Sequence, residues 1–377
     1  MLYFLFEYLD KYGLIGAGVF KYISFRASLA GILSLLISLI AGKKIINFLQ
    51  KKQIGESIRD LGLEGQIEKK GTPTMGGIII LIAIIIPTLL LAKLNNVYVI
   101  LMIVSTIWMG MIGIVDDYIK IFKKDKKGMK ASTKLVGQLV LGAIIAITID
   151  YTHTLSHIDL STNLPITKNI LNYSDLIPGA HNAWIIFIPM IVIVSMAVTN
   201  SVNLTDGIDG LAAGTSAIVG VGLVVLAYAA GNFKMAQYLN IIFVPNSGEV
   251  VIFLAAMIGA CLGFLWYNGY PAQVFMGDTG SMALGGAIAA VAIIIKMELM
   301  LPILCGIFFT ESASVIIQVG YFKYTKFRFG EGRRVFLMSP IHHHFQKKNI
   351  PESKITIRFW LITIILVLAT LALIKLR

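Results

Sequence analysis

Long continuous runs of apolar residues are the feature that most constrains this sequence. A helix needs about 20 mainly apolar residues to cross the hydrocarbon core of a bilayer. The runs do not alternate between apolar and polar positions, so they predict helices and not the strands of a β-barrel. The sequence therefore predicts an all-α, polytopic integral membrane protein with about ten transmembrane helices. The predicted spans are roughly 23–42, 75–92, 97–119, 135–151, 183–199, 208–230, 250–267, 281–297, 299–320 and 356–374.

The composition agrees with a membrane protein and excludes other classes. Hydrophobic residues make up 57% of the 377-residue chain and charged residues only 14%, whereas a soluble protein carries about 25% charged residues. The two cysteines, Cys261 and Cys305, lie within apolar runs, which leaves no basis for a disulfide framework. Glu7 and Asp10 stand where a signal peptide would be positively charged, so no cleavable signal is expected.

The distribution of basic residues predicts the orientation. Lys and Arg concentrate in cytoplasmic loops. Of the 32 basic residues, 23 fall in or beside the odd-numbered loops and 4 in the even-numbered ones. The odd loops are therefore predicted to be cytoplasmic, with both termini outside the cytoplasm. The net charge of +12 thus reflects topology, and no nucleic-acid partner is expected because no soluble basic surface with interleaved aromatic residues is present.

Two adjacent carboxylates, Asp116 and Asp117, close the third predicted span. They repel each other, and the carboxyl end of a helix disfavours negative charge. A divalent cation or the lysines that follow should therefore compensate them. The basic run 120–134 is expected to be a solvated loop facing anionic lipid. Within it, Lys120 and Lys134 lie nearest the helix ends and are the candidates for contact with phosphate.

The other odd-numbered loops carry further polar segments. Segment 69–77 (KKGTPTMGG) fits a turn before a helix, or a phosphate site that combines Gly and Thr amides with Lys70. Segment 200–210 has four amide or carboxylate side chains, of which helix capping explains only one comfortably. The fourth loop carries Asn268 and segment 275–281 (FMGDTGS), whose Asp278 also fits a solvated turn. The four polar residues of 200–210 are Asn200, Asn203, Asp206 and Asp209.

Three consecutive histidines, His342, His343 and His344, follow Ser339-Pro340 in the fifth cytoplasmic loop. Adjacent side chains splay apart and no cysteine accompanies them, which disfavours a zinc site. Imidazoles around a phosphate or a substrate carboxylate fit better. Capping a helix or neutralising acids is the structural alternative.

These segments share one predicted face and indicate one chemistry. Clustered Asp residues with scattered Lys and His, and no Ser or Cys nucleophile motif, indicate Mg²⁺-assisted handling of phosphates, because Mg²⁺ prefers oxygen ligands and binds through a few carboxylates plus substrate phosphates. A metal that bridges a pyrophosphate neutralises charge on the leaving phosphate. The membrane location indicates a lipid partner, and the cytoplasmic face a cytosolic one.

The motifs resemble those of the phospho-N-acetylmuramoyl-pentapeptide transferases, a branch of the polyprenyl-phosphate N-acetylhexosamine-1-phosphate transferase superfamily. The Asp-Asp and Gly-Asp segments are common to the superfamily, whereas the triple His and NLTDGIDG look like the muramoyl-pentapeptide branch. The resemblance covers essentially the whole chain and implies a single transferase domain over 1–377. The segments that carry it are KKGTPTMGG (69–77), GIVDDYIK (113–120), NLTDGIDGLA (203–212), FMGDTGSMALGG (275–286) and SPIHHHF (339–345).

The resemblance implies a reaction. Undecaprenyl phosphate would attack the β-phosphorus of UDP-N-acetylmuramoyl-pentapeptide, giving lipid I and UMP with Mg²⁺ required. It implies Asp278 as a metal ligand, Asp117 near the metal, and Asp116 as base or nucleophile, with direct attack and a covalent intermediate both open. It also implies a bacterial inner-membrane protein of peptidoglycan synthesis, and commonly a homodimer.

The resemblance also distributes the substrate-binding residues. Asn203, Asp206 and Phe275 match positions around the uridine, Lys70 a phosphate or ribose neighbour, and the histidines the sugar or peptide side. The full set expected to bind substrate is Lys70, Thr74, Lys120, Lys134, Asn200, Asn203, Asp206, Asp209, Asn268, Phe275, Gly277, His342, His343 and His344.

Three other functions compete with this interpretation. A sister transferase would use UDP-N-acetylglucosamine with the same lipid acceptor. A cation-coupled transporter would also use carboxylates in the membrane, but its site usually lies near the midplane on broken helices, whereas these acids lie at span ends. A non-catalytic scaffold would not need five polar loops on one side.

Overall fold

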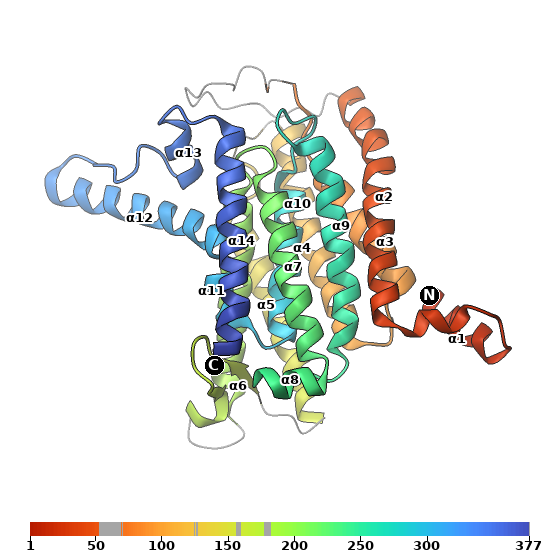
Figure 1. Ribbon diagram of the computed structural model, residues 1–377. Coiled ribbons are helices and arrows are strands. Elements are labelled where there is room, and N and C mark those ends of the chain that lie inside the picture. Colours follow the sequence, from red (N-terminus) through yellow and green to blue (C-terminus); the bar gives the residue numbers. More distant parts are fainter. Residues whose placement is uncertain are drawn as a thin grey trace.

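The protein is a helical bundle with a small hairpin at one end (Figure 1). The computed structural model describes residues 1–52, 69, 71–123, 125, 127–155, 160–176 and 182–376. The α-helices are α1 (Leu2–Lys11), α2 (Ile23–Lys51), α3 (Gly77–Leu91), α4 (Val97–Phe122), α5 (Ala131–Leu155), α6 (Trp184–Thr205), α7 (Leu211–Ala230), α8 (Phe233–Leu239), α9 (Val250–Asn268), α10 (Gly277–Ile294), α11 (Leu301–Leu304), α12 (Gly306–Phe329), α13 (Ile341–Gln346) and α14 (Glu352–Leu376). Short 3₁₀ turns are η1 (Ala17–Lys21), η2 (Tyr173–Leu176), η3 (Ser247–Glu249) and η4 (Glu298–Met300), and the antiparallel hairpin pairs β1 (Ser161–Asn163) with β2 (Ile170–Asn172).

The prediction of an all-α polytopic membrane protein is confirmed. Within the described residues, eight helices are long and apolar enough to cross a membrane, and a bent helix pair would make a ninth span. The predicted span at 75–92 corresponds to the apolar helix α3, which has only 15 residues. Both termini lie at the end of the bundle opposite α13 (Figure 1).

The predicted span at 299–320 is broken and not straight. Segment Glu298–Leu304 and helix α12 meet at 81°, and α12 leaves the bundle sideways (Figure 1). The break falls at Cys305, where the backbone departs from helical geometry (φ −100°, ψ 25°). The next residue, Gly306, lies so close to α14 that a Cβ there would be 2.8 Å from a Leu366 methyl group. A glycine at the break therefore allows α12 to start against α14 and to continue in a new direction.

Helix α10 is the core of the bundle. Every residue from Thr279 to Ile294 is buried, and α10 packs against α3, α4, α6 and α7. Its Gly, Ala and Ser residues let neighbouring helices approach closely, which is the usual basis of helix packing in membranes. A Cβ on Gly285, for example, would lie 2.7 Å from the Cα of Thr199 on α6.

The first turn of α10 makes the closest of these approaches. A Cβ on Gly113 of α4 would overlap the carbonyl oxygen of Asp278 and lie 2.6 Å from the Cα of Thr279. A Cβ on Gly77 of α3 would likewise overlap the backbone of Gly280. Backbone atoms cannot yield as a flexible side chain can, so α3 and α4 fix the position of this turn.

A buried ion pair braces the opposite end of the bundle. Both terminal nitrogens of Arg26 on α2 donate to Glu249 at 2.7 Å, and one also donates to the Leu91 carbonyl. The Arg26 side chain has no exposed surface. Because removing one partner of a buried pair leaves an uncompensated charge, this contact ties α2, α3 and η3 together.

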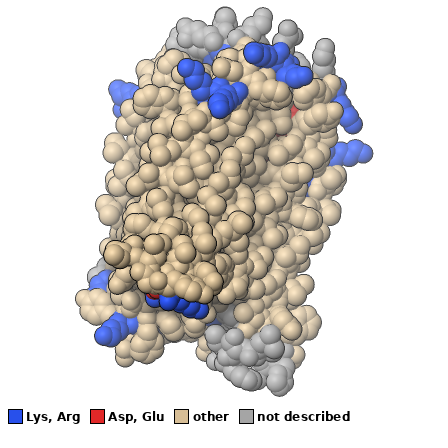
Figure 2. All heavy atoms as spheres, turned by 90° about the vertical axis from the view of Figure 1, so that its right-hand side faces the viewer, with Lys and Arg blue, Asp and Glu red and all other residues tan. Residues whose placement is uncertain are grey.

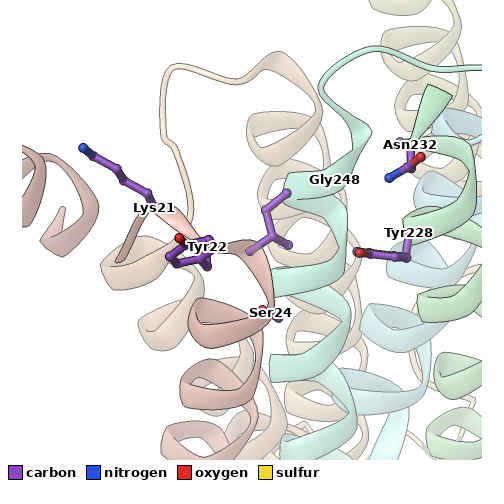
Figure 3. A pocket seen from close by; sticks show the side chains of 8 residues that line it. Lys21, Tyr22, Ser24, Tyr228, Asn232 and Gly248 are labelled. Atoms are coloured by element: carbon purple, nitrogen blue, oxygen red, sulfur yellow. The ribbon is translucent and has the colours of Figure 1, made fainter. Parts of the chain in front are cut away.

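A pocket of about 280 Å³ opens beside this brace. Lys21, Tyr22 and Ser24 line it from the start of α2, and Tyr228, Asn232 and Gly248 line its other side (Figure 3). It lies at the end of the bundle that holds the N-terminus.

The surface has the charge distribution of a membrane protein. On the face shown in Figure 2, the Lys and Arg side chains of the described residues gather near the two ends of the long axis, and the broad band between them is free of charged atoms. The uncharged band matches the requirement that lipid-facing surface be apolar. The chain is thus a multi-pass membrane protein.

Replacing Gly113 by Ala should destabilise the protein more than replacing Gly110, one turn earlier on α4. The Gly113 Cβ would meet the α10 backbone, whereas the Gly110 Cβ would meet only the movable Leu81 methyl groups at 2.8 Å. Overpacking of this kind costs about 1–3 kcal/mol. Thermal unfolding of both variants in the same detergent measures the difference, and equal melting temperatures would contradict the close approach of α4 and α10.

Candidate active site

Three carboxylates from two helices converge at one end of the bundle. Asp116 and Asp117 lie near the end of α4, and Asp278 lies in the first turn of α10. Each offers a carboxylate oxygen within 4.8 Å of the others. Asp116 has no exposed surface and Asp117 is 3% exposed. The adjacent acids noted in the sequence thus lie beside Asp278, which is 161 residues after Asp117 in the chain.

Two lysines bridge the two outer members of this cluster. Lys120 Nζ lies 2.6 Å from Asp116 Oδ2 and 3.0 Å from Asp278 Oδ2. Lys134 Nζ lies 2.9 Å and 2.6 Å from the same two atoms. Asp116 Oδ1 also accepts the Met129 amide at 2.6 Å. The lysines compensate the repulsion between the acids, and both predicted phosphate-contact residues lie in the cluster.

Asp117 has a different set of partners. Its carboxylate accepts the Asp278 amide at 3.1 Å, the Thr279 amide at 2.9 Å and the Thr279 hydroxyl at 2.7 Å. These amides belong to the first turn of α10, where backbone donors have no partner within the helix. A negative charge at a helix amino terminus is also favoured by the helix dipole. Asp117 therefore holds the residue that carries the third carboxylate.

Helix α6 completes the surroundings of Asp278. Asn203 Nδ2 donates to Asp278 Oδ1 and to Ser281 Oγ, both at 2.9 Å. Asp206 is the residue at which α6 ends, so it lies one turn beyond Asn203. Asn200, one turn earlier, exchanges two hydrogen bonds with Gln138 of α5 and so braces α5 against α6 instead of facing the carboxylates.

Segments 73–77 and 275–277 lie side by side next to the cluster. The Phe275 amide donates to the Pro73 carbonyl at 2.8 Å, and the Gly76 amide donates to the Phe275 carbonyl at 2.9 Å. Gly277 has a positive φ of 72°, and a Cβ there would lie 2.7 Å from Asp117 Oδ2 and 3.0 Å from Thr74 Oγ1. Residue 277 must therefore be small and left-handed. Lys70 lies outside the described residues.

A second ionic network lies on the other side of the α6–α7 turn. Lys69 Nζ lies 2.7 Å from Asp209 and 2.5 Å from Glu352 at the start of α14. The second Asp209 oxygen accepts the Ala272 amide at 2.9 Å. Burial alone would lower the pKa of Lys69, but the charges of Glu352 and Asp209 raise it above its ordinary value. Lys69 is therefore a cation that joins its own segment to the α6–α7 turn and to the start of α14.

Asn268 supports the same region. Its side chain accepts the Gly210 amide at 3.1 Å and donates to the Val274 carbonyl at 2.9 Å. It therefore connects the end of α9, the turn after α6 and the segment that leads to Phe275.

The three histidines have three different surroundings. His342 is fully buried, with Nδ1 3.1 Å from Glu311 Oε2. His343 Nδ1 is 2.7 Å from Gln346 Oε1, and burial, followed by the neighbouring His342, lowers the pKa of His343 to about 4. His344 Nδ1 accepts the Leu337 amide at 3.1 Å, and burial together with Lys348 lowers its pKa. His343 is thus a neutral imidazole at physiological pH.

Several residues of these networks were not singled out from the sequence. They are Lys69, Gln138, Glu311 and Glu352. Their positions in the sequence do not show which residues they contact, and only those partners reveal a role. Thr279 and Ser281 lie in the quoted segment 275–286. Their roles depend on tertiary contacts, because Thr279 donates to Asp117 and Ser281 accepts from Asn203.

The donor set fits a hard divalent cation. Asp116, Asp117 and Asp278 supply oxygens only, and oxygen ligands are those that Mg²⁺ prefers. Both lysines of the cluster carry ammonium groups that can shift to a bound phosphate, since each already lies between two carboxylates. The arrangement can therefore bring a cation and phosphates together.

Comparisons with known proteins agree with the site. The family model for glycosyl transferase family 4 matches residues 99–296, and phospho-N-acetylmuramoyl-pentapeptide-transferase signature 1 matches residues 69–81. The chain is 53% identical to the phospho-N-acetylmuramoyl-pentapeptide-transferases of Parabacteroides distasonis and Flavobacterium psychrophilum, over the whole of each chain. It is 50% identical to that of Porphyromonas gingivalis, again over both full lengths. The chain therefore belongs to glycosyl transferase family 4 and, within it, to the phospho-N-acetylmuramoyl-pentapeptide-transferases.

Proposed function

We propose that the chain transfers phospho-N-acetylmuramoyl-pentapeptide from UDP-N-acetylmuramoyl-pentapeptide to undecaprenyl phosphate. The products are lipid I, a precursor of peptidoglycan, and UMP. The observation that carries the proposal is the cluster of Asp116, Asp117 and Asp278 with Lys120 and Lys134 between them, in a chain similar over its full length to transferases of that name. The cluster lies at the ends of two helices and not at mid-span, which disfavours a transporter.

Mg²⁺ is the proposed cofactor. Asp278 and Asp117 would hold it, with Asp116 beside them. When bound, the cation neutralises negative charge on the pyrophosphate and on the leaving UMP. The contacts of Asp117 with the first turn of α10 add a second role, because they orient Asp278.

The chain's own residues carry the remaining steps. Lys120 and Lys134 bind the phosphates and reduce the repulsion between the two anionic substrates. An oxygen of undecaprenyl phosphate forms a bond to the β-phosphorus while the bond from that phosphorus to the UMP oxygen breaks. In this direct route Asp116 accepts a proton from the lipid phosphate. In the alternative route the Asp116 carboxylate attacks the β-phosphorus and UMP leaves, after which the lipid phosphate oxygen bonds that phosphorus and the bond to Asp116 breaks. The buried position of Asp116 between two ammonium groups supports either role.

The proposal divides the substrate-binding residues between the nucleotide and the sugar-peptide. Asn203, Asp206 and Phe275 would surround the uridine, Lys70 would be a phosphate or ribose neighbour, and Thr74 would lie in the same region. Asp209, Asn268 and Gly277 shape the same region through the contacts described above, and Asn200 braces its helix. The segment with His342, His343 and His344 lies on the sugar and peptide side.

The first test is release of UMP. Purified protein mixed with undecaprenyl phosphate and Mg²⁺ is expected to release UMP from UDP-N-acetylmuramoyl-pentapeptide and to form lipid I. Omission of the lipid or chelation of the cation should abolish stoichiometric release. UDP-N-acetylglucosamine is the matched control, because faster turnover of that sugar nucleotide would assign the chain to a sister transferase. Transport of a solute across the membrane without release of UMP would indicate a transporter.

Asp278→Asn should lower turnover by at least about a thousandfold, or roughly 4 kcal/mol of transition-state stabilisation. The substitution keeps the shape but removes the charge that faces both lysines. Binding of UMP to the variant should also lose its dependence on Mg²⁺, measured by calorimetry. Asp125→Asn is the control, since Asp125 is an exposed acid of the following loop whose side chain, among the described residues, accepts the Lys127 amide. Near-normal turnover of Asp278→Asn at any Mg²⁺ concentration would contradict the assignment.

We also propose that the site faces the cytoplasm, that both termini face outward, and that the chain is a single domain of the bacterial inner membrane that forms homodimers. The excess of basic residues in the loops next to the site supports this orientation. Lys127→Cys and Lys168→Cys each place one new cysteine at an exposed position. An impermeant thiol reagent should label Lys168→Cys in intact vesicles and Lys127→Cys in inverted vesicles. Labelling of both from the same side would contradict the orientation.

A further inference from the structure

A buried acid and imidazole join α12 to α13 behind the site. Glu311, in the second turn of α12, and His342, near the start of α13, have no exposed side-chain surface. Glu311 Oε2 lies 3.1 Å from His342 Nδ1 and 3.5 Å from the His342 amide. Within the described residues, Glu311 Oε1 and both ring nitrogens of His342 have no hydrogen-bond partner, so the contact between Glu311 and Nδ1 is an ion-pair approach and not a hydrogen bond. The two side chains therefore depend on each other.

The His342 ring lies directly on the turn between α6 and α7. A Cβ on Gly207 would lie 2.6 Å from the ring Cε1 and would overlap Nε2. Gly207 follows Asp206, at which α6 ends, and Asn203 in the last turn of α6 donates to Asp278. The ring thus contacts Gly207, four residues after Asn203, whose hydrogen bond holds the Asp278 carboxylate.

Apolar side chains surround this contact. Ile208 and Leu211 from the α6–α7 turn form a small buried cluster with Ile307 of α12 and Phe359 of α14, and Ile341 and Phe345 of α13 pack against it. A buried ion pair in such a cluster adds little to stability compared with apolar residues of the same volume. It does add a fixed geometry, because a carboxylate close to one imidazole nitrogen and bonded to the backbone amide of the same residue restricts the orientation of the ring.

We propose that Glu311 is a positioning residue for the transfer reaction. The Glu311 carboxylate, 3.1 Å from Nδ1, holds the His342 ring on Gly207, and the ring holds turn 206–210 so that Asn203 stays on Asp278. Glu311 acts through the ring and does not itself touch substrate or cation. The proposal rests on the proposed function, and it places its effect on the nucleotide side, where Asn203 and Asp206 lie.

The direct test is Glu311→Gln, which keeps the size and one acceptor but removes the charge. The KM for UDP-N-acetylmuramoyl-pentapeptide should rise at least fivefold, while the KM for undecaprenyl phosphate stays within twofold of wild type. The dissociation constant of UMP in Mg²⁺ should rise by the same factor, measured by calorimetry. A variant that is only less stable has fewer active molecules, which lowers kcat and leaves both KM values unchanged.

A double-mutant cycle tests the path through the ring. Asn at position 342 can still donate to Glu311 but lacks the ring atoms that face Gly207. His342→Asn should therefore raise the same KM, and Gly207→Ala should raise it further because its methyl group meets the ring. The double variant Gly207→Ala/His342→Asn should be no worse than His342→Asn alone. Additive effects would overturn the proposed path.

Ser314→Ala is the matched control on the same helix. Ser314 is buried, and within the described part of the chain its hydroxyl donates to the Glu311 carbonyl alone, so both KM values should remain those of wild type. Wild-type UMP affinity and KM in Glu311→Gln would overturn the inference, as would equal effects in Ser314→Ala. If Glu311→Gln does not fold, His342→Asn is measured in the same way. Wild-type protein that releases no UMP would instead contradict the proposed function.

Discussion

The close backbone approach of the first turn of α10 to α3 and α4 is the constraint on which the site depends. Gly77 and Gly113 leave no space for a side chain at this point, and the Asp117 carboxylate binds the free amides of the same turn. Asp278 therefore sits on a turn fixed by backbone contacts on two sides and by a charged cap on a third. Rigid support of this kind is what a reacting group requires, because small displacements reduce catalysis strongly.

The remaining polar segments at this end of the bundle are organised around the turn between α6 and α7. Asn203 connects the end of α6 to Asp278, and Asp209 connects the turn to Lys69 and Glu352. Glu311 and His342 hold the opposite side of the turn. Segment 69–77 thus shares one short element next to the carboxylates with α13 and the start of α14, which lie more than 260 residues later in the chain.

Much of this arrangement could be predicted from the sequence. Hydrophobicity predicts the helices because the bilayer imposes their length, and the basic loops predict which motifs meet at one end. Asp116 and Asp117 were informative because adjacent acids at a helix end require compensation, which Lys120 and Lys134 provide. The substrate contacts of these residues remain predictions.

The partners of isolated polar residues could not be predicted in the same way. Arg26 lies within the first predicted span and is buried against Glu249. The Asn200 amide bonds Gln138, and its contact with substrate stays a prediction. The 81° bend before α12 depends on how Gly306 packs against Leu366, and no local pattern shows that contact. Each depends on tertiary neighbours and not on the adjacent sequence.

The pairing of lysines and aspartates also bears on how the protein is made. Three carboxylates without countercharges at a helix junction would oppose assembly of α4 with α10. Here Lys120 and Lys134 balance Asp116 and Asp278, and backbone amides receive Asp117. The newly inserted chain consequently carries its own countercharges, so its helices can assemble before any cytosolic ligand reaches the membrane.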